Sequence, residues 1–181
     1  SSTPIHLQEM TDALAHRGPD GEGLWQNESG TVLLGHRRLS IIDLSEAGQQ
    51  PLHYTDRYTI IHNGEIYNYI ELKETLRQKG YLFRSETDTE VIAAAYDCWK
   101  DECVDHFDGM FAFAIWDARH ERLFLARDRF GKKPLFLYEA NDVLLFASEI
   151  KSLLTFPGVN VEVEPEAVWD YLMYRYVPAP N

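Results

Sequence analysis

The second half of the chain contains four short apolar segments that follow one another with almost no sequence between them. They run over 110–117, 123–127, 135–138 and 143–147, and the intervening 118–121, 131–134 and 141–142 are turn-like. Connections this short join antiparallel strands, because parallel neighbours need a crossover of about a dozen residues or more. We therefore expect an α+β fold with antiparallel sheets rather than an alternating doubly wound sheet.

The first half of the chain combines helical and strand patterns. A first helix is expected from Thr3–Pro4, with an apolar core stripe of Leu7, Met10 and Leu14. A second is expected from about Tyr67, with Gly80 closing its end. A third is expected from Thr87, which has capping-box spacing to Glu90. Residues 23–26 and 32–37 flank a turn and predict a hairpin, and 58–62 predicts a short buried strand. Helices grouped between strands agree with the α+β assignment.

No linker or repeat divides the sequence before residue 156, so we expect one domain over residues 1–155. Residues 156–165 then hold two prolines and a glycine, a short helical run through Val168 and Tyr171 follows, and the last five residues are VPAPN. We interpret 156–181 as a connector toward a further domain.

Charge and composition exclude several classes of function. Acidic side chains outnumber basic ones by 29 to 17, and a net charge of −12 opposes binding to nucleic acid or to anionic membranes. No apolar run approaches the roughly 18 residues needed to span a bilayer, and the start lacks signal-peptide features, so we expect no membrane association and a cytoplasmic location. Cys98 and Cys103 fit neither a disulfide framework nor a zinc site, so we expect structural cysteines and no metal.

Two polar segments hold more charge and glycine than structural turns need. The segment HRGPDGEG, residues 16–23, predicts tight turns after a helix. The segment GHRRLSIID, residues 35–43, places Arg37 and Arg38 at the end of an apolar strand. An arginine fork suits a carboxylate, so one of the two could anchor an acid; an exposed arginine that gains little from a surface ion pair is the alternative.

Two further polar segments follow. HNGEIYN, residues 62–68, predicts either a two-residue hairpin turn at Asn63–Gly64 or a strand end at a helix entrance. The helical pattern downstream favours the second, in which the Asn63 amide and a backbone N–H could together stabilise an oxyanion. SETDTE, residues 85–90, begins a helix whose dipole stabilises the Asp88 carboxylate by about 0.3 to 1 kcal/mol. That carboxylate could serve as a cap or receive a ligand ammonium.

Taken in order, seven segments resemble a known family: HRGPDGEG, GHRRLSIID, HNGEIYNY, SETDTEV, GMFAFAIWD, LARDRFGKKPLF and ASEIKSL. They resemble the class II, N-terminal-nucleophile glutamine amidotransferase domain of glutamine-hydrolysing asparagine synthetases, and the resemblance runs from Met10 to about Asn181. It implies a four-layer α-β-β-α sandwich of two antiparallel sheets between helices.

The resemblance also implies an activity. Glutamine would be hydrolysed to glutamate and ammonia, and a C-terminal synthetase domain of the same polypeptide would use the ammonia for ATP-dependent amidation of aspartate. No cofactor is expected in this domain, ATP and Mg²⁺ are expected in the synthetase domain, and a homodimer is possible. A non-catalytic glutamine-sensing or structural domain of an amide synthetase is the alternative.

Site residues follow from the resemblance alone. It implies that Arg38 holds the glutamine α-carboxylate beside the main chain of Leu39, Ile41 and Ile42, that Asn63 and Gly64 form the oxyanion hole, and that Glu65 and Asp88 receive the α-ammonium.

The nucleophile departs from the family pattern. In this family it is a cysteine at the mature N-terminus whose own α-amine is the base. Residue 1 here is a serine that aligns with the loop before the first helix, and neither Cys98 nor Cys103 matches the nucleophile. We expect the nucleophile on a strand that precedes this sequence, so the 181-residue chain by itself should bind glutamine poorly and should not hydrolyse it.

Overall fold

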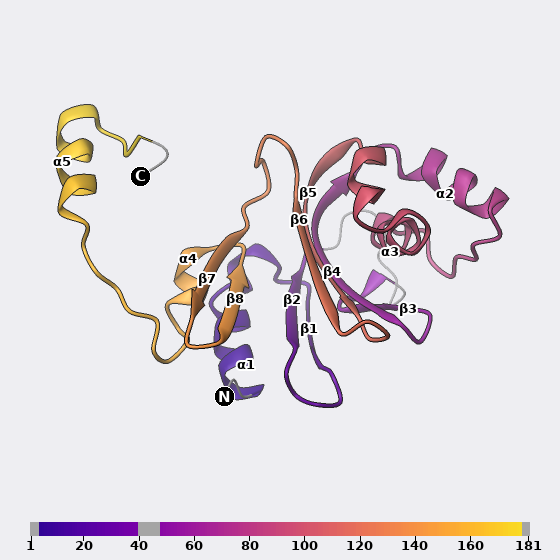
Figure 1. Ribbon diagram of the computed structural model, residues 1–181, viewed down its shortest axis with the longest axis horizontal. Coiled ribbons are helices and arrows are strands. Elements are labelled where there is room, and N and C mark those ends of the chain that lie inside the picture. The colour runs from indigo at the N-terminus through magenta and orange to yellow at the C-terminus, as the bar shows by residue number, and fades with distance from the viewer. Residues whose placement is uncertain (1–3, 40–47, 179–181) are drawn as a thin grey trace.

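The computed structural model describes residues 4–39 and 48–178 (Figure 1). Its elements, in chain order, are α1 (Pro4–Asp12), η1 (Ala15–Arg17), β1 (Gly21–Gln26), β2 (Leu33–Arg38), β3 (Leu52–Tyr54), β4 (Tyr58–Ile66), α2 (Tyr69–Gln78), α3 (Asp88–Trp99), η3 (Lys100–His106), β5 (Gly109–Asp117), β6 (Arg122–Arg127), β7 (Phe136–Ala140), β8 (Val143–Ala147), α4 (Ile150–Leu153) and α5 (Pro165–Tyr174). The expected antiparallel strands of the second half are confirmed.

The main sheet has the strand order β3-β4-β5-β6, and all of its neighbouring strands are antiparallel. Helices α2 and α3 cover one face of this sheet (Figure 1). The largest apolar cluster lies between these two helices and the sheet, and it includes Ile60, Leu76, Ile92 and Ile115, all fully buried. Ala93–Ala95 face this cluster from α3, and their small side chains allow the helix to lie close to the sheet.

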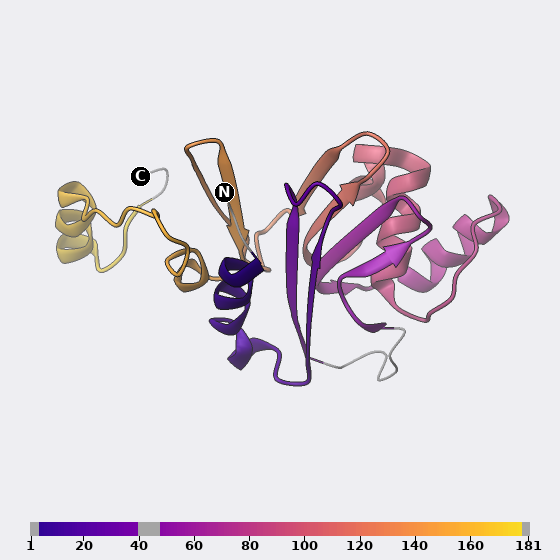
Figure 2. The ribbon, with the colours of Figure 1, turned by 90° about the horizontal axis from the view of Figure 1, so that it is seen from below.

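Two separate hairpins, β1–β2 and β7–β8, lie on the opposite side of the main sheet. Helices α1 and α4 lie beyond these hairpins, so the layers run helix, sheet, hairpins, helix, as Figure 2 shows. The expected α-β-β-α order is therefore present. The second β layer differs from the expected continuous sheet, because β2 pairs only with β1 and β8 only with β7 within the described ranges.

Strand β4 is longer than the sequence predicts. It continues past His62 to Ile66, with Asn63 opposite Ala112 and Gly64 opposite Phe111. Both interpretations of Asn63–Gly64, a hairpin turn and a helix entrance, are wrong, because β5 provides a pairing partner along the whole strand. Helix α2 accordingly begins only at residue 69.

One predicted helix cap is confirmed, and one apolar stripe is less buried than expected. Thr87 caps α3, since its hydroxyl accepts the Glu90 N–H at 3.3 Å, as its spacing predicted. The apolar stripe of Leu7 and Met10 on α1 and Leu14 just after it is only half-buried and borders a cavity, whereas it was expected in the core. The reason is that α1 packs against the hairpin layer beside the cavity that β2 and β8 also line, so its apolar side chains border that cavity.

The C-terminal segment is loosely attached. Phe156 and Val159 pack beside a small cluster that includes Leu145 and Leu153. Helix α5, in contrast, has no buried residue. None of the helices in the described ranges combines the length and the apolar character that crossing a membrane requires.

Candidate functional site

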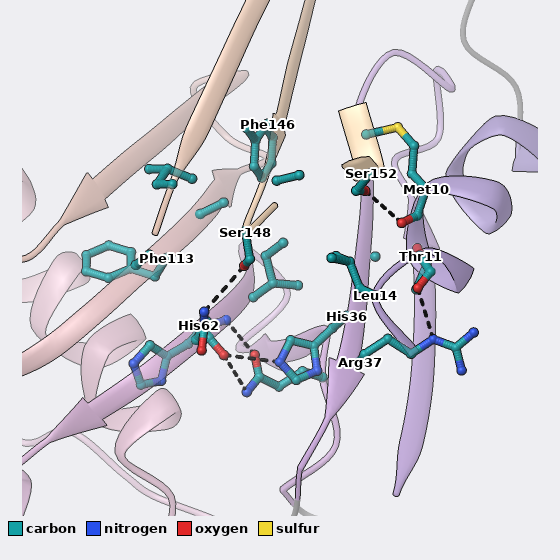
Figure 3. Close-up of a pocket in the computed structure, with 18 of the residues that line it drawn as sticks. Met10, Thr11, Leu14, His36, Arg37, His62, Phe113, Phe146, Ser148 and Ser152 are labelled. Atoms are coloured by element: carbon teal, nitrogen blue, oxygen red, sulfur yellow. Dashed lines mark hydrogen bonds between the residues drawn. The ribbon is translucent and has the colours of Figure 1, made fainter. Parts of the chain in front are cut away.

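A cavity of about 630 Å³ separates the main sheet from the two hairpins and α1 (Figure 3). Its lining includes six of the eight residues predicted from the sequence: Arg38, Leu39, Asn63, Gly64, Glu65 and Asp88. Ile41 and Ile42 lie outside the described residues. The fold therefore brings three segments that are distant in sequence, around residues 38, 64 and 88, to one cavity.

The edges of β4 can be assigned from two hydrogen bonds just beyond its ends. Ala118 N–H donates to Arg57 C=O at 2.9 Å, and Tyr67 N–H donates to Asp108 C=O at 2.7 Å. Odd-numbered residues of β4 therefore bond to β5, and the peptide groups of even-numbered residues point to the opposite edge. We call this opposite edge the β3-side edge. Strand β3 itself pairs only with residues 58–60 of β4.

Two side chains cap the β3-side edge beyond β3. The Gln50 carboxamide accepts the His62 N–H at 2.5 Å and donates to the His62 C=O at 3.2 Å. The Asp88 carboxylate accepts the Ile66 N–H at 3.0 Å. Gly64 lies between these capped residues, so its N–H points from the same edge toward the cavity that it lines.

Asn63 completes a pair of donors with Gly64. Its side chain lies on the cavity side of the sheet, and its Nδ2 atom donates to the Ser148 hydroxyl at 3.3 Å. An amide N–H and a backbone N–H on neighbouring residues can hold an oxygen that develops negative charge. Ser148, which follows β8, is a site residue that the sequence did not reveal, because its role depends on a contact across the cavity.

Asp88 is buried, with 5% of its surface exposed. Thr87 caps the helix, so the Asp88 carboxylate is free of that role and instead bonds to the backbone of β4. Its second oxygen lies 3.9 Å from His62 Nδ1. The carboxylate thus joins the start of α3 to the β3-side edge.

Arg37 and Arg38 have different surroundings. Arg37 donates to the Thr11 carbonyl at 3.2 Å and forms ion pairs with Asp12 and Glu22, which makes it a structural residue. Arg38 lines the cavity and is half-buried, as Arg37 is, but among the described residues no ion pair with Asp12 or Glu22 joins it to α1 or β1. The turn of the HRGPDGEG segment lies against Arg38, whose carbonyl accepts the Asp20 N–H at 3.0 Å.

Two histidines at the site were not predicted. His36 Nε2 lies 3.1 Å from the His62 carbonyl, and since a carbonyl only accepts, Nε2 carries the proton (Figure 3). Burial lowers the pKa of His36 to about 4 and also lowers the pKa of His62. His36 Nδ1 and His62 Nε2 are buried without a hydrogen-bond partner among the described residues. Both side chains are therefore neutral at pH 7.

The two cysteines lie away from the site. Neither is part of the cavity lining, and both are free thiols. Burial raises the pKa of Cys103 to about 12, which leaves it as an unreactive thiol at pH 7.

Comparison with solved structures identifies the class of fold. The chain superposes on the glutamine phosphoribosylpyrophosphate amidotransferase from Bacillus subtilis with a TM-score of 0.68 and 22% identity, over 84% of this chain and 40% of that one. The fold is therefore that of amidotransferases of this type.

Sequence comparison identifies the family. A family model described as "Glutamine amidotransferase domain" matches residues 2–181, and the chain belongs to this family. It is 47% identical to asparagine synthetase [glutamine-hydrolyzing] 1 of Bacillus subtilis, over 97% of this chain and 27% of that protein. It is 43% identical to a putative asparagine synthetase [glutamine-hydrolyzing] of Mycobacterium tuberculosis, over 97% and 28%. The chain thus spans about a quarter of the length of these relatives.

Proposed function

We propose that this domain hydrolyses glutamine to glutamate and ammonia within a longer amidotransferase. The observation that carries the proposal is the Gly64 N–H on the β3-side edge of β4, next to the Asn63 carboxamide. The substrate amide oxygen lies between these two donors. Arg38 holds the α-carboxylate beside the main chain of Leu39, Ile41 and Ile42.

Glu65 and Asp88 receive the α-ammonium in this proposal, and both line the cavity. One oxygen of Asp88 is committed to the Ile66 N–H, so the second oxygen is the acceptor. This division gives Asp88 two roles, since it orders the strand edge and provides the negative charge for the substrate amine.

The nucleophile is a cysteine on an additional strand between β2 and β8. Two features support this placement: both strands line the cavity, and each has an unpaired edge within the described ranges. The thiolate attacks the side-chain amide carbon, and the carbonyl oxygen becomes the oxyanion held by Asn63 and Gly64. The terminal amine, which took the thiol proton when the thiolate formed, gives that proton to the amide nitrogen as the C–N bond breaks, so the nitrogen leaves as ammonia. Water then hydrolyses the thioester to glutamate and restores the thiol.

The ammonia passes to an ATP-dependent domain of the longer protein, which amidates aspartate. The names of the relatives support this acceptor. ATP and Mg²⁺ act in that domain, and this domain needs no cofactor. A cytoplasmic location and a homodimer belong to the same proposal.

Paired arginine variants of the longer protein test the substrate assignment. Arg38→Ala removes a charge-assisted contact of about 1.5 to 3 kcal/mol, so the glutamine KM should rise about 10- to 150-fold. Arg37 also borders the cavity, but its guanidinium is paired with Asp12 and Glu22. Arg37→Ala, the matched control, should therefore weaken the packing of α1 and β1 with little change in KM. Synthesis supported by free ammonia should persist in both variants.

An unchanged glutamine KM in Arg38→Ala would contradict the assignment. Saturable glutamine binding by the longer protein without ammonia release would instead indicate a non-catalytic glutamine-binding domain.

A further inference from the structure

Gln50 lies where the chain approaches β3, and its side chain takes the place that a neighbouring strand would occupy. Its Oε1 atom accepts the His62 N–H at 2.5 Å, and its Nε2 atom donates to the His62 C=O at 3.2 Å. A carboxamide offers one acceptor and donors in the same plane, as a peptide group does. Gln50 therefore extends the hydrogen bonding along this edge of β4 to His62, two residues beyond Ile60, the last residue of β4 that pairs with β3.

We propose that Gln50 is a positioning residue for the oxyanion donors, an inference that rests on the proposed glutaminase function. The Gly64 peptide lies two residues beyond the one that Gln50 holds. The Gly64 N–H shares a planar peptide unit with the Asn63 C=O, which points toward β5, so the pairing with β5 directs this N–H to the β3-side edge, where β3 no longer pairs with β4. Gln50 on one side and Asp88 on the other fix the strand edge, and with it that N–H.

Neighbouring residues hold Gln50 and His62 in place. A Cβ atom on Gly23 would lie 1.9 Å from the Gln50 carbonyl oxygen, so only glycine in β1 allows this close approach. His36 donates a second hydrogen bond to the His62 carbonyl, at 3.1 Å. Thr89 Oγ1 lies 3.5 Å from Gln50 Nε2 and 3.3 Å from His62 Nδ1. The cap thus connects β1, β2 and α3 to the peptide that precedes the donors.

The variant Gln50→Glu changes the hydrogen bonding of residue 50 and keeps the size of its side chain, so it tests positioning without a change in packing. The carboxylate has the same shape and still accepts the His62 N–H, but it cannot donate to the His62 carbonyl and places an oxygen against it. The neighbouring Gln49 is exposed, so Gln49→Glu makes the same chemical change without touching β4 and serves as the matched control.

Steady-state kinetics of the longer protein test the positioning. Gln50→Glu should lower kcat for glutamine hydrolysis about 10- to 100-fold, because small displacements of donors have effects of this size. The glutamine KM should change less than about threefold, since the contacts of the α-substituents remain. Ammonia-dependent synthesis and all parameters of Gln49→Glu should match wild type. An unchanged kcat, or an equal loss of both activities, would overturn the proposal.

Amide NMR gives a readout that is independent of turnover. Gln50→Glu should shift the amide resonance of Gly64, whereas Gln49→Glu should leave it in place, and Gln50→Ala should accelerate hydrogen exchange at His62, whose N–H then lacks its acceptor. A wild-type protein that releases no ammonia overturns the proposed function. In that case a shifted Gly64 resonance in Gln50→Glu still supports the positioning, and an unchanged resonance overturns it.

Discussion

Gly64 combines a positive φ with a close approach to the backbone of β5, and each of these features excludes a side chain at this position. Its φ of +150° is unfavourable for other residues, and a Cβ atom there would lie 2.1 Å from the Met110 carbonyl oxygen and 2.7 Å from Phe111 Cα. We expect Gly64→Ala to lower the free energy of unfolding by about 2 to 4 kcal/mol, measured by urea denaturation. Gly30 also has a positive φ, of +66°, but nothing lies within 4 Å of its Cβ position. Gly30→Ala should therefore cost only about 1 kcal/mol, and equal losses in the two variants would contradict the close approach at Gly64.

His36 makes stability depend on pH. Its pKa is about 4 in the fold, below the ordinary 6.5, because of burial. Between these values the unfolded chain binds a proton that the native state does not, so stability falls as pH decreases from 6.5 to 4, by at most about 1.4 kcal/mol per pH unit.

The variant His36→Gln tests this dependence. Glutamine can donate to the His62 carbonyl but does not titrate, so unfolding free energies measured from pH 7 to pH 4 should decline less steeply than in wild type. Identical slopes would show that His36 is not the responsible group.

At the scale of elements, Asp128 organises the connection that leaves β6. Its carboxylate accepts N–H bonds from Phe130 at 3.2 Å, Lys132 at 2.8 Å and Lys133 at 2.9 Å, and from Phe111 of β5 at 3.3 Å. Burial alone would raise the pKa of Asp128, but these backbone donors lower it below 3.8. The stabilisation is therefore present above pH 3.8 and is lost as pH falls through the lower native pKa.

Asp128→Asn should lower the free energy of unfolding by about 2 to 3 kcal/mol at pH 7, because the bonds to a charged acceptor are lost. The exposed Asp56 provides a control, and Asp56→Asn should change stability by less than about 0.5 kcal/mol. Denaturant titration of both variants measures the difference; similar small effects would contradict the role of Asp128.

Local sequence signals predicted the elements that depend on local chemistry. Turn residues delimited β5 to β8, and the Thr87–Glu90 spacing located the start of α3. The length of β4 was missed because Asn63–Gly64 is a local turn signal, which nine residues of pairing with β5 override. At the site, motifs indicated Arg38, Asn63, Gly64 and Asp88, whereas Gln50, His62 and Ser148 act through contacts between segments that no local pattern encodes.

At the scale of the whole molecule, α5 contributes little to the folded domain. Trp169 and Leu172 are 65% and 71% exposed, and no residue of α5 is buried. Ending the chain after Asn160 should therefore leave the melting temperature unchanged, measured by calorimetry. A fall of several degrees would show that α5 supports the domain. We expect the apolar side chains of α5 to be covered by a further domain in the longer protein.

The four layers meet at one cavity, and the central claim is that the β3-side edge of β4 provides the oxyanion donors there. The most direct test is kcat for glutamine hydrolysis by Asn63→Ala in the longer protein. The account predicts a loss of about 100- to 1,000-fold with nearly unchanged glutamine KM and intact ammonia-dependent synthesis. An unchanged kcat, or a rise in KM alone, would contradict it.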